Sequence, residues 1–211
     1  MNRLALLLPL AVAAFALAGC GGSGSSSTTA PPAPTTASAA PATTTTAATG
    51  SPGSLQAEAN AAATGDIPDN QVFLTFRDTA GGFSIKYPEG WAQNGAGKNV
   101  LFRDKNNIVR VVIGSGGAAT PTQVHSDVAS LAGATIQHAP ARMTISGKPA
   151  IKVTYTTQSA PNAVTGKRVT LVVDRYYLWN GSRRAVVDLG TPQGVDNVDA
   201  YRMMIESFRW S

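Results

Sequence analysis

The sequence predicts a folded domain of the α+β class, an antiparallel β-sheet sandwiched by helices, at the end of a long low-complexity segment. Three observations predict it. Between about residues 71 and 211, apolar and polar residues repeatedly alternate with the period of a β-strand. Turn-forming sequences separate most of these runs, which favours hairpins. Only two stretches have helical spacing, one in the middle and one at the end.

The domain begins with two predicted strand pairs. Residues 72–76 and 83–87 alternate on either side of a Gly-rich turn, and residues 100–103 and 108–113 flank the turn-forming run 104–107. The alternation of the first strand places three residues on one face: Val72, Leu74 and Phe76.

A helix is predicted to follow these strands. Thr120 is a suitable N-cap, and Pro121 suits the first helical position, where its missing N–H costs nothing. The expected buried face of this helix consists of Val124, Val128 and Leu131.

Four more strands are predicted after the helix. Residues 136–145 and 151–156 alternate around a short turn. Residues 169–179 and 185–189 flank Asn180-Gly181, which is the strongest short hairpin signal in a sequence.

A second helix closes the domain. We expect it to begin near Asp196, whose carboxylate can cap it, while Asp199 lies on the favourable side of the helix dipole. The residues expected on its inner face are Val198, Tyr201, Ile205 and Phe208.

Residues 1–19 have the layout of a secretory signal peptide, with Arg3 before an apolar run from Leu4 to Leu17. This run spans only about 21 Å as a helix, which is short of the roughly 30 Å bilayer core. Leu17-Ala18-Gly19-Cys20 resembles the lipobox of bacterial lipoproteins, in which the cysteine receives a diacylglyceryl group. We therefore expect Cys20 to be lipidated, and the chain to be anchored on the extracytoplasmic face of the cell membrane.

Residues 20–64 are rich in Thr, Ala, Ser, Pro and Gly, with Glu58 as the only charged residue. Such a composition cannot bury enough apolar surface to fold, so we expect a disordered tether. Its root-mean-square span would be about 35 to 40 Å. The run Thr43 to Thr46 resembles the O-mannosylated stalks of actinobacterial lipoproteins.

The charge and the single cysteine exclude several classes of function. Removing residues 1–19 takes Arg3 away, which leaves 16 Lys and Arg against 12 Asp and Glu, a net charge of +4. The basic residues are scattered, and an extracytoplasmic chain is an unexpected partner for nucleic acid. The net positive charge favours a weak attraction to anionic lipid head groups or wall polymers. Because Cys20 is the only cysteine, no disulfide can form within the chain.

No catalytic or metal-binding set stands out in the folded segment. The two histidines, His125 and His138, lack the spacing of metal ligands, and no cysteine can assist them. The segment contains no Gly-x-Ser-x-Gly nucleophile elbow. Residues 114–117 are Gly-rich but lack the end of a phosphate-binding loop, so we expect a connector without a cofactor.

Aromatic and basic residues gather around the predicted hairpin at Asn180-Gly181. Alternate side chains of a strand point to opposite faces, so part of this set is available for binding a glycan or a lipid head group, and the rest packs under the helices. The candidate ligand-binding residues are Tyr177, Trp179, Arg183 and Arg184.

Two stretches give the domain a family resemblance. They are Gly-Phe-Ser-Ile-Lys-Tyr-Pro-Glu-Gly-Trp at residues 82–91 and Tyr-Arg-Met-Met-Ile-Glu-Ser-Phe-Arg-Trp at residues 201–210. With them the chain resembles the PsbP-type α/β/α sandwich, and within it the actinobacterial lipoproteins similar to the mycobacterial LpqN group. The resemblance implies a binding or accessory protein, because the family includes extrinsic subunits of photosystem II, a Ran-binding import factor and envelope lipoproteins, and shares no catalytic set.

We therefore expect a non-enzymatic module of the cell envelope whose ligand is a glycolipid, a wall polymer or a protein. Two alternatives stay open. One is a hydrolase of the envelope that uses carboxylates such as Glu89, Asp174 and Asp188, which would have to flank a cleft in pairs. The other is a structural protomer that docks onto a partner by a sheet edge.

Overall fold

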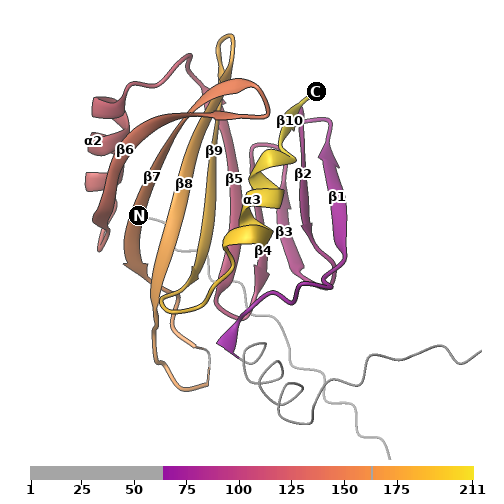
Figure 1. Ribbon diagram of the computed structural model, residues 1–211, viewed down its shortest axis with the longest axis vertical. Coiled ribbons are helices and arrows are strands. Elements are labelled where there is room, and N and C mark those ends of the chain that lie inside the picture. Colours follow the sequence, from indigo (N-terminus) through magenta and orange to yellow (C-terminus); the bar gives the residue numbers. More distant parts are fainter. Residues whose placement is uncertain (1–63, 163) are drawn as a thin grey trace, which may run out of the picture. The chain divides into compact units, whose positions relative to one another are not determined.

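The computed structural model describes residues 64–162 and 164–211 of the chain (Figure 1). The strands are β1 (Phe73–Asp78), β2 (Phe83–Pro88), β3 (Ala92–Ala96), β4 (Asn99–Asp104), β5 (Asn107–Ser115), β6 (Thr135–Ile145), β7 (Lys148–Gln158), β8 (Thr170–Asn180), β9 (Arg183–Pro192) and β10 (Arg209–Trp210). The helices are α2 (Pro121–Ala129) and α3 (Val198–Glu206).

The strands form two antiparallel sheets. The larger sheet has seven strands in the order β3-β4-β5-β9-β8-β7-β6, and the smaller has three in the order β1-β2-β10. Every paired strand is antiparallel to its neighbour. This arrangement, together with the two helices, confirms the predicted α+β class.

Each face of the larger sheet has its own hydrophobic core. On one face the sheet packs against α3 and the small sheet, and Figure 1 shows α3 in front of the central strands. The largest buried side chains of this core include Phe83, Ile85, Phe102 and Met204. On the other face α2 packs mainly on β6 and β7. The core beneath it includes Val124, Val128, Ile151, Val153 and Tyr177.

Helix α2 begins as its sequence predicts. Thr120 is the N-cap, its side chain accepts a hydrogen bond from the backbone N–H of Gln123, and the Gln123 side chain accepts one from the Thr120 N–H. This reciprocal capping box satisfies two amides that a helix end otherwise leaves unpaired. Val124 and Val128 are fully buried as predicted, whereas Leu131 lies after the end of the helix and is only partly buried against the same core.

Helix α3 begins slightly later than expected, and its first residue, Val198, is not part of the core. The N-cap is Asn197, while the Asp196 carboxylate accepts a hydrogen bond from the Val198 N–H at 3.2 Å. The prediction that Val198 faces inward is wrong, since it is 67% exposed. The buried side chains of α3 are Tyr201, Met204 and Ile205, so its inward face begins one turn later. Tyr201, with Ile205 and Phe208, is buried as predicted.

The side chains of β1 are mostly exposed or partly buried. Val72 and Leu74 are 55% and 39% exposed, whereas Phe73 and Phe76 pack against the core. Strand β1 lies at the edge of the small sheet and pairs only with β2, so one of its sides is open to solvent.

The hairpin at Asn180-Gly181 forms as predicted and joins β8 to β9. Gly181 has φ = 58°, a conformation that glycine adopts without strain. Residues 65–70, which precede the expected domain start at Gln71, also pack onto the domain, and Ile67 is part of the core. In the part of the chain described, no helix is long and apolar enough to cross a membrane.

Candidate functional site

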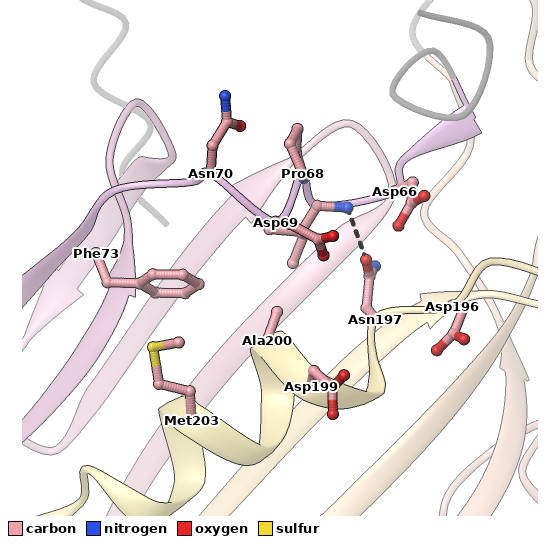
Figure 2. A pocket seen from close by; sticks show the side chains of 11 residues that line it. Asp66, Pro68, Asp69, Asn70, Phe73, Asp196, Asn197, Asp199, Ala200 and Met203 are labelled. Carbon is pink, nitrogen blue, oxygen red and sulfur yellow. Dashed lines mark hydrogen bonds between the residues drawn. The ribbon is translucent and has the colours of Figure 1, made fainter. Parts of the chain in front are cut away.

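A cavity of about 600 Å³ lies between α3 and the segment that leads into β1. Figure 2 shows Phe73 and Met203 facing each other at one end, and Asp196 at the other. The residues that line it are Asp66, Ile67, Pro68, Asp69, Asn70, Phe73, Asp196, Asn197, Asp199, Ala200 and Met203. We call this cavity the acidic pocket.

A buried hydrogen-bond network holds the two walls of the acidic pocket together. Asn197 is only 3% exposed, and its side-chain oxygen accepts a hydrogen bond from the Ile67 N–H at 2.8 Å (Figure 2). Its side-chain nitrogen donates to the carbonyl of Gly65 and to the hydroxyl of Thr191. The Asn107 side chain donates to the same Gly65 carbonyl. Because every bond of this network is buried or partly buried, the segment before β1 is fixed in place.

The charge of the acidic pocket is one-sided. Four of its lining residues are aspartates, and none of the eleven lining residues is basic. Asp199 forms an ion pair with Arg202 on the exposed side of α3. Apolar side chains of Phe73, Ala200 and Met203 accompany the carboxylates. Negative charge beside an apolar surface suits a ligand with a cationic side chain or a cationic segment.

The lining of this pocket combines carboxylate groups with apolar side chains. Among the described residues no group of three or more His, Cys, Asp or Glu side chains is arranged to hold a metal ion. Its lining contains no serine, cysteine, histidine or lysine, so the ionisable groups that it presents are the four aspartates. What the pocket offers is carboxylate oxygens at its rim and an apolar wall.

A second cavity of about 380 Å³ lies on the opposite face of the sheet, beside α2. Its lining residues are Val112, Gly114, Ser115, Asp127, Ser130, Leu131, Arg175, Tyr177, Arg184 and Val186. We call it the α2 groove.

The floor of the α2 groove contains a buried ion pair. The Arg175 guanidinium donates from Nε and Nη2 to the two carboxylate oxygens of Asp188, at 2.6 and 2.9 Å. Burial opposes the charge on Arg175, but the hydrogen bond and the attraction of Asp188 outweigh it and raise the pKa of Arg175. The guanidinium also lies 5.4 Å from the centre of the Tyr155 ring. Burial, followed by the Asp188 charge, raises the pKa of Tyr155 to about 12.

The structure brings two of the four predicted ligand-binding residues together in the α2 groove. Tyr177 is 2% exposed, and burial raises the pKa of its hydroxyl. Arg184 donates from Nε and Nη2 to the carbonyl of Gly117, at 3.1 and 2.9 Å. It thereby holds the Gly-rich connector between β5 and α2.

Trp179 and Arg183 do not join this pair in the lining. Trp179 lies opposite Arg184 in the β8–β9 ladder and is half-buried against the core under α2. Arg183 is on the other face of the hairpin, where its guanidinium donates to the Gly81 carbonyl and lies 4.8 Å from the Trp210 ring centre. The roles that the structure shows for Arg183 are structural.

The carboxylates considered for a hydrolase lie apart. Asp188 faces α2 and pairs with Arg175, whereas Asp174 lies on the α3 face and pairs with Lys152 at 2.7 Å. Glu89 is in the turn after β2. They therefore do not flank a common cleft. Cys20, the predicted lipidation site, lies outside the described residues.

Sequence reasoning did not identify the acidic pocket. Asp66 and Asp69 lie before the expected domain start, and Asp196 was considered only as a helix cap. The sequence does contain a signal for the pocket, because Asp66 and Asp69 are the first charged residues after a long stretch whose only charged residue is Glu58. Only the fold, through Asn197, brings that segment beside α3.

The solved structures that resemble this fold include the following two. One is the solution structure of cyanobacterial PsbP (CyanoP) from Synechocystis sp. PCC 6803, with 17% identity and a TM-score of 0.49, covering 70% of this chain and 98% of that one. The other is a crystal structure from Bacteroides thetaiotaomicron VPI-5482, with 14% identity and a TM-score of 0.45, covering 65% of this chain. This chain spans about half (48%) of the Bacteroides protein. No curated protein matches the chain.

The family model described as PsbP matches residues 71–186, from the segment before β1 to β9. This range covers more than half of the 211 residues. The protein therefore belongs to the PsbP family.

Proposed function

We propose that this protein is a non-enzymatic binding module, anchored through a lipid on Cys20 to the extracytoplasmic face of the cell membrane. The signal-like N-terminus, the lipobox and the low-complexity segment 20–64 support the location. Membership of a family of binding and accessory domains fits the role. The similarity to actinobacterial lipoproteins of the LpqN group belongs to the same proposal.

The acidic pocket is the observation that carries the binding role. It gathers four of the eleven acidic residues of the described part of the chain, in a protein whose net charge is +5. The nearby apolar side chains, Phe73 and Met203 among them, would contact the aliphatic part of a ligand. Of the ligand classes open from the sequence, a protein segment with lysine or arginine beside apolar residues fits this pocket best, because anionic glycolipids and wall polymers would be repelled.

Binding of a defined cationic peptide tests this proposal. The probe is a fluorescent peptide of alternating lysine and leucine, with a glutamate and leucine peptide as its counterpart. If each of two partly screened carboxylates contributes close to 1 kcal/mol of binding free energy, their loss changes Kd about tenfold to thirtyfold. We expect the double variant Asp66→Asn, Asp69→Asn to lose that much affinity, and 1 M salt, at which charges are screened within about 3 Å, to weaken binding further.

A matched variant provides the control. Asp104→Asn with Glu89→Gln removes the same charge from positions outside the pocket. We expect it to bind the lysine peptide like the unaltered chain. Equal losses in both double variants would show that only net charge matters, and tighter binding of the glutamate peptide would overturn the assignment of the pocket.

The anchor is tested separately. A Cys20→Ser variant cannot form the thioether, so it should be found in the soluble fraction or remain an uncleaved precursor. Tight membrane association of the cleaved variant would contradict lipidation at Cys20.

A further inference from the structure

The face of the large sheet that carries α2 is only half covered. Helix α2 packs mainly on β6 and β7, at one end of the sheet. At the other end, β4 and β5 present a row of partly or fully exposed side chains on this face. These residues, which we call the open half-face, are Leu101, Arg103, Ile108, Arg110 and Val112.

The strand register places these side chains in rows across the sheet. Leu101 lies opposite Arg110, and Arg110 lies opposite Asp188, which in turn lies opposite Arg175. A second row places Arg103 opposite Ile108. Cross-strand partners point to the same side, so arginines and aliphatic side chains alternate on one surface.

The positive charge of the open half-face is not neutralised. Asp188 is 4% exposed and its two oxygens are occupied by Arg175. Among the residues that the structure describes, Arg103 and Arg110 form no ion pair, and the polar contact of Arg110 is to the Asn99 side chain at 3.2 Å. Both guanidinium groups are exposed.

We propose that the open half-face docks on the surface of a bilayer that contains anionic phospholipid. Guanidinium groups bind phosphate in a bidentate manner, and half-buried aliphatic side chains between them suit the interfacial region. The adjoining α2 groove continues this surface with Arg184 and two serine hydroxyls, although Asp127 also lies on its rim. An acidic protein would match the same charges, but the inference rests here on the membrane anchor of the proposed function, which makes a lipid surface the expected occupant.

This orientation agrees with the position of the acidic pocket. The pocket is lined by α3, which packs on the opposite face of the sheet. With the open half-face on the bilayer, the pocket would point away from the lipid, where a partner can reach it. The inference goes beyond the proposed function, and it does not depend on ligand binding in the pocket.

Vesicle co-sedimentation tests the inference. The protein is the mature chain from residue 20 with Cys20→Ser, so that no acyl chain contributes, and the vesicles contain phosphatidylcholine with or without phosphatidylglycerol. Because each basic residue near an anionic surface strengthens partitioning about fivefold at low salt, Arg103→Gln with Arg110→Gln should weaken binding to anionic vesicles by up to about thirtyfold.

The matched control is Arg77→Gln with Lys86→Gln, which removes the same charge from exposed positions on the small sheet. We expect the control to retain binding, and circular dichroism to show that both variants are folded. Amide hydrogen exchange should be slowed by anionic vesicles in β4 and β5, and unchanged in α3.

Three results would overturn the inference. They are absence of binding to anionic vesicles, equal losses in the two double variants, and protection of α3 in place of β4 and β5. None of them would affect the peptide test of the acidic pocket, which uses different variants in the absence of lipid.

Discussion

Replacing Asp188 with asparagine should destabilise the domain far more than its single charge suggests. The carboxylate accepts two hydrogen bonds from Arg175, and the two side chains are only 5% and 11% exposed. Asp188→Asn would leave a buried guanidinium without a counter-ion, which costs about 3–5 kcal/mol. Since domains of this size are stable by roughly 5–15 kcal/mol, this loss is a large fraction of the total.

A matched substitution measures what exposure contributes. Asp174 pairs with Lys152 at 2.7 Å, but their side chains are 28% and 34% exposed. Asp174→Asn should therefore cost only about 0–1 kcal/mol. The double variant Arg175→Met, Asp188→Leu removes both buried charges and should recover most of the stability lost by Asp188→Asn, because it leaves no unpaired group.

Urea unfolding at 25 °C, followed by tryptophan fluorescence and circular dichroism, measures all four proteins. We expect coincident transitions with unchanged slopes, so that the midpoint alone reports the loss of stability. If Asp188→Asn lost no more stability than Asp174→Asn, or if the double variant were the least stable of the set, the argument from burial would be refuted.

Three further predictions concern single groups. The pKa of Tyr155 is raised to about 12, so its contribution to the free energy of unfolding is fully present below pH 10. Between about pH 10 and 12 the stability of the unaltered chain should fall more steeply than that of Tyr155→Phe, as measured by urea midpoints. Backbone hydrogen bonds, first from the N–H of Gly81, lower the pKa of Asp78, so its stabilising effect should be present above about pH 4 and lost as pH falls, whereas Asp78→Asn should lack this acid dependence. Gly190→Ala would place a Cβ 2.7 Å from Ile108 Cγ1 and should lower stability by about 1–3 kcal/mol in thermal unfolding.

Most of the fold could be predicted because its elements are marked by local chemistry. Thr120-Pro121 begins α2, and Asn180-Gly181 makes the β8–β9 turn, since each needs only residues close in sequence. The predicted buried faces were wrong where the packing of distant elements decides which side chains are covered. Val198 has the spacing of an inner helix residue, yet it is 67% exposed, and the buried face of α3 begins at Tyr201.

The binding surfaces were harder to predict because they are made by contacts distant in sequence. Asp66 and Asp196 line one pocket only because Asn197 bonds to Ile67, across 130 positions. Of the four residues predicted to bind a ligand, all on the β8–β9 hairpin, Tyr177 and Arg184 lie in one groove and Trp179 and Arg183 do not. What periodicity could not indicate is that Tyr177 is buried there.

The methionine methyl groups offer the most direct test of the acidic pocket as the binding site. Met203 lines the pocket and is 43% exposed, Met204 is fully buried, and Met143 lies on β6. In the mature chain with ¹³C-labelled methionine methyls, titration with the lysine and leucine peptide should shift the Met203 signal to saturation and leave Met143 in place. A peptide that binds without moving Met203, or that moves it equally in the Asp66→Asn, Asp69→Asn variant, would contradict the proposed role of the pocket.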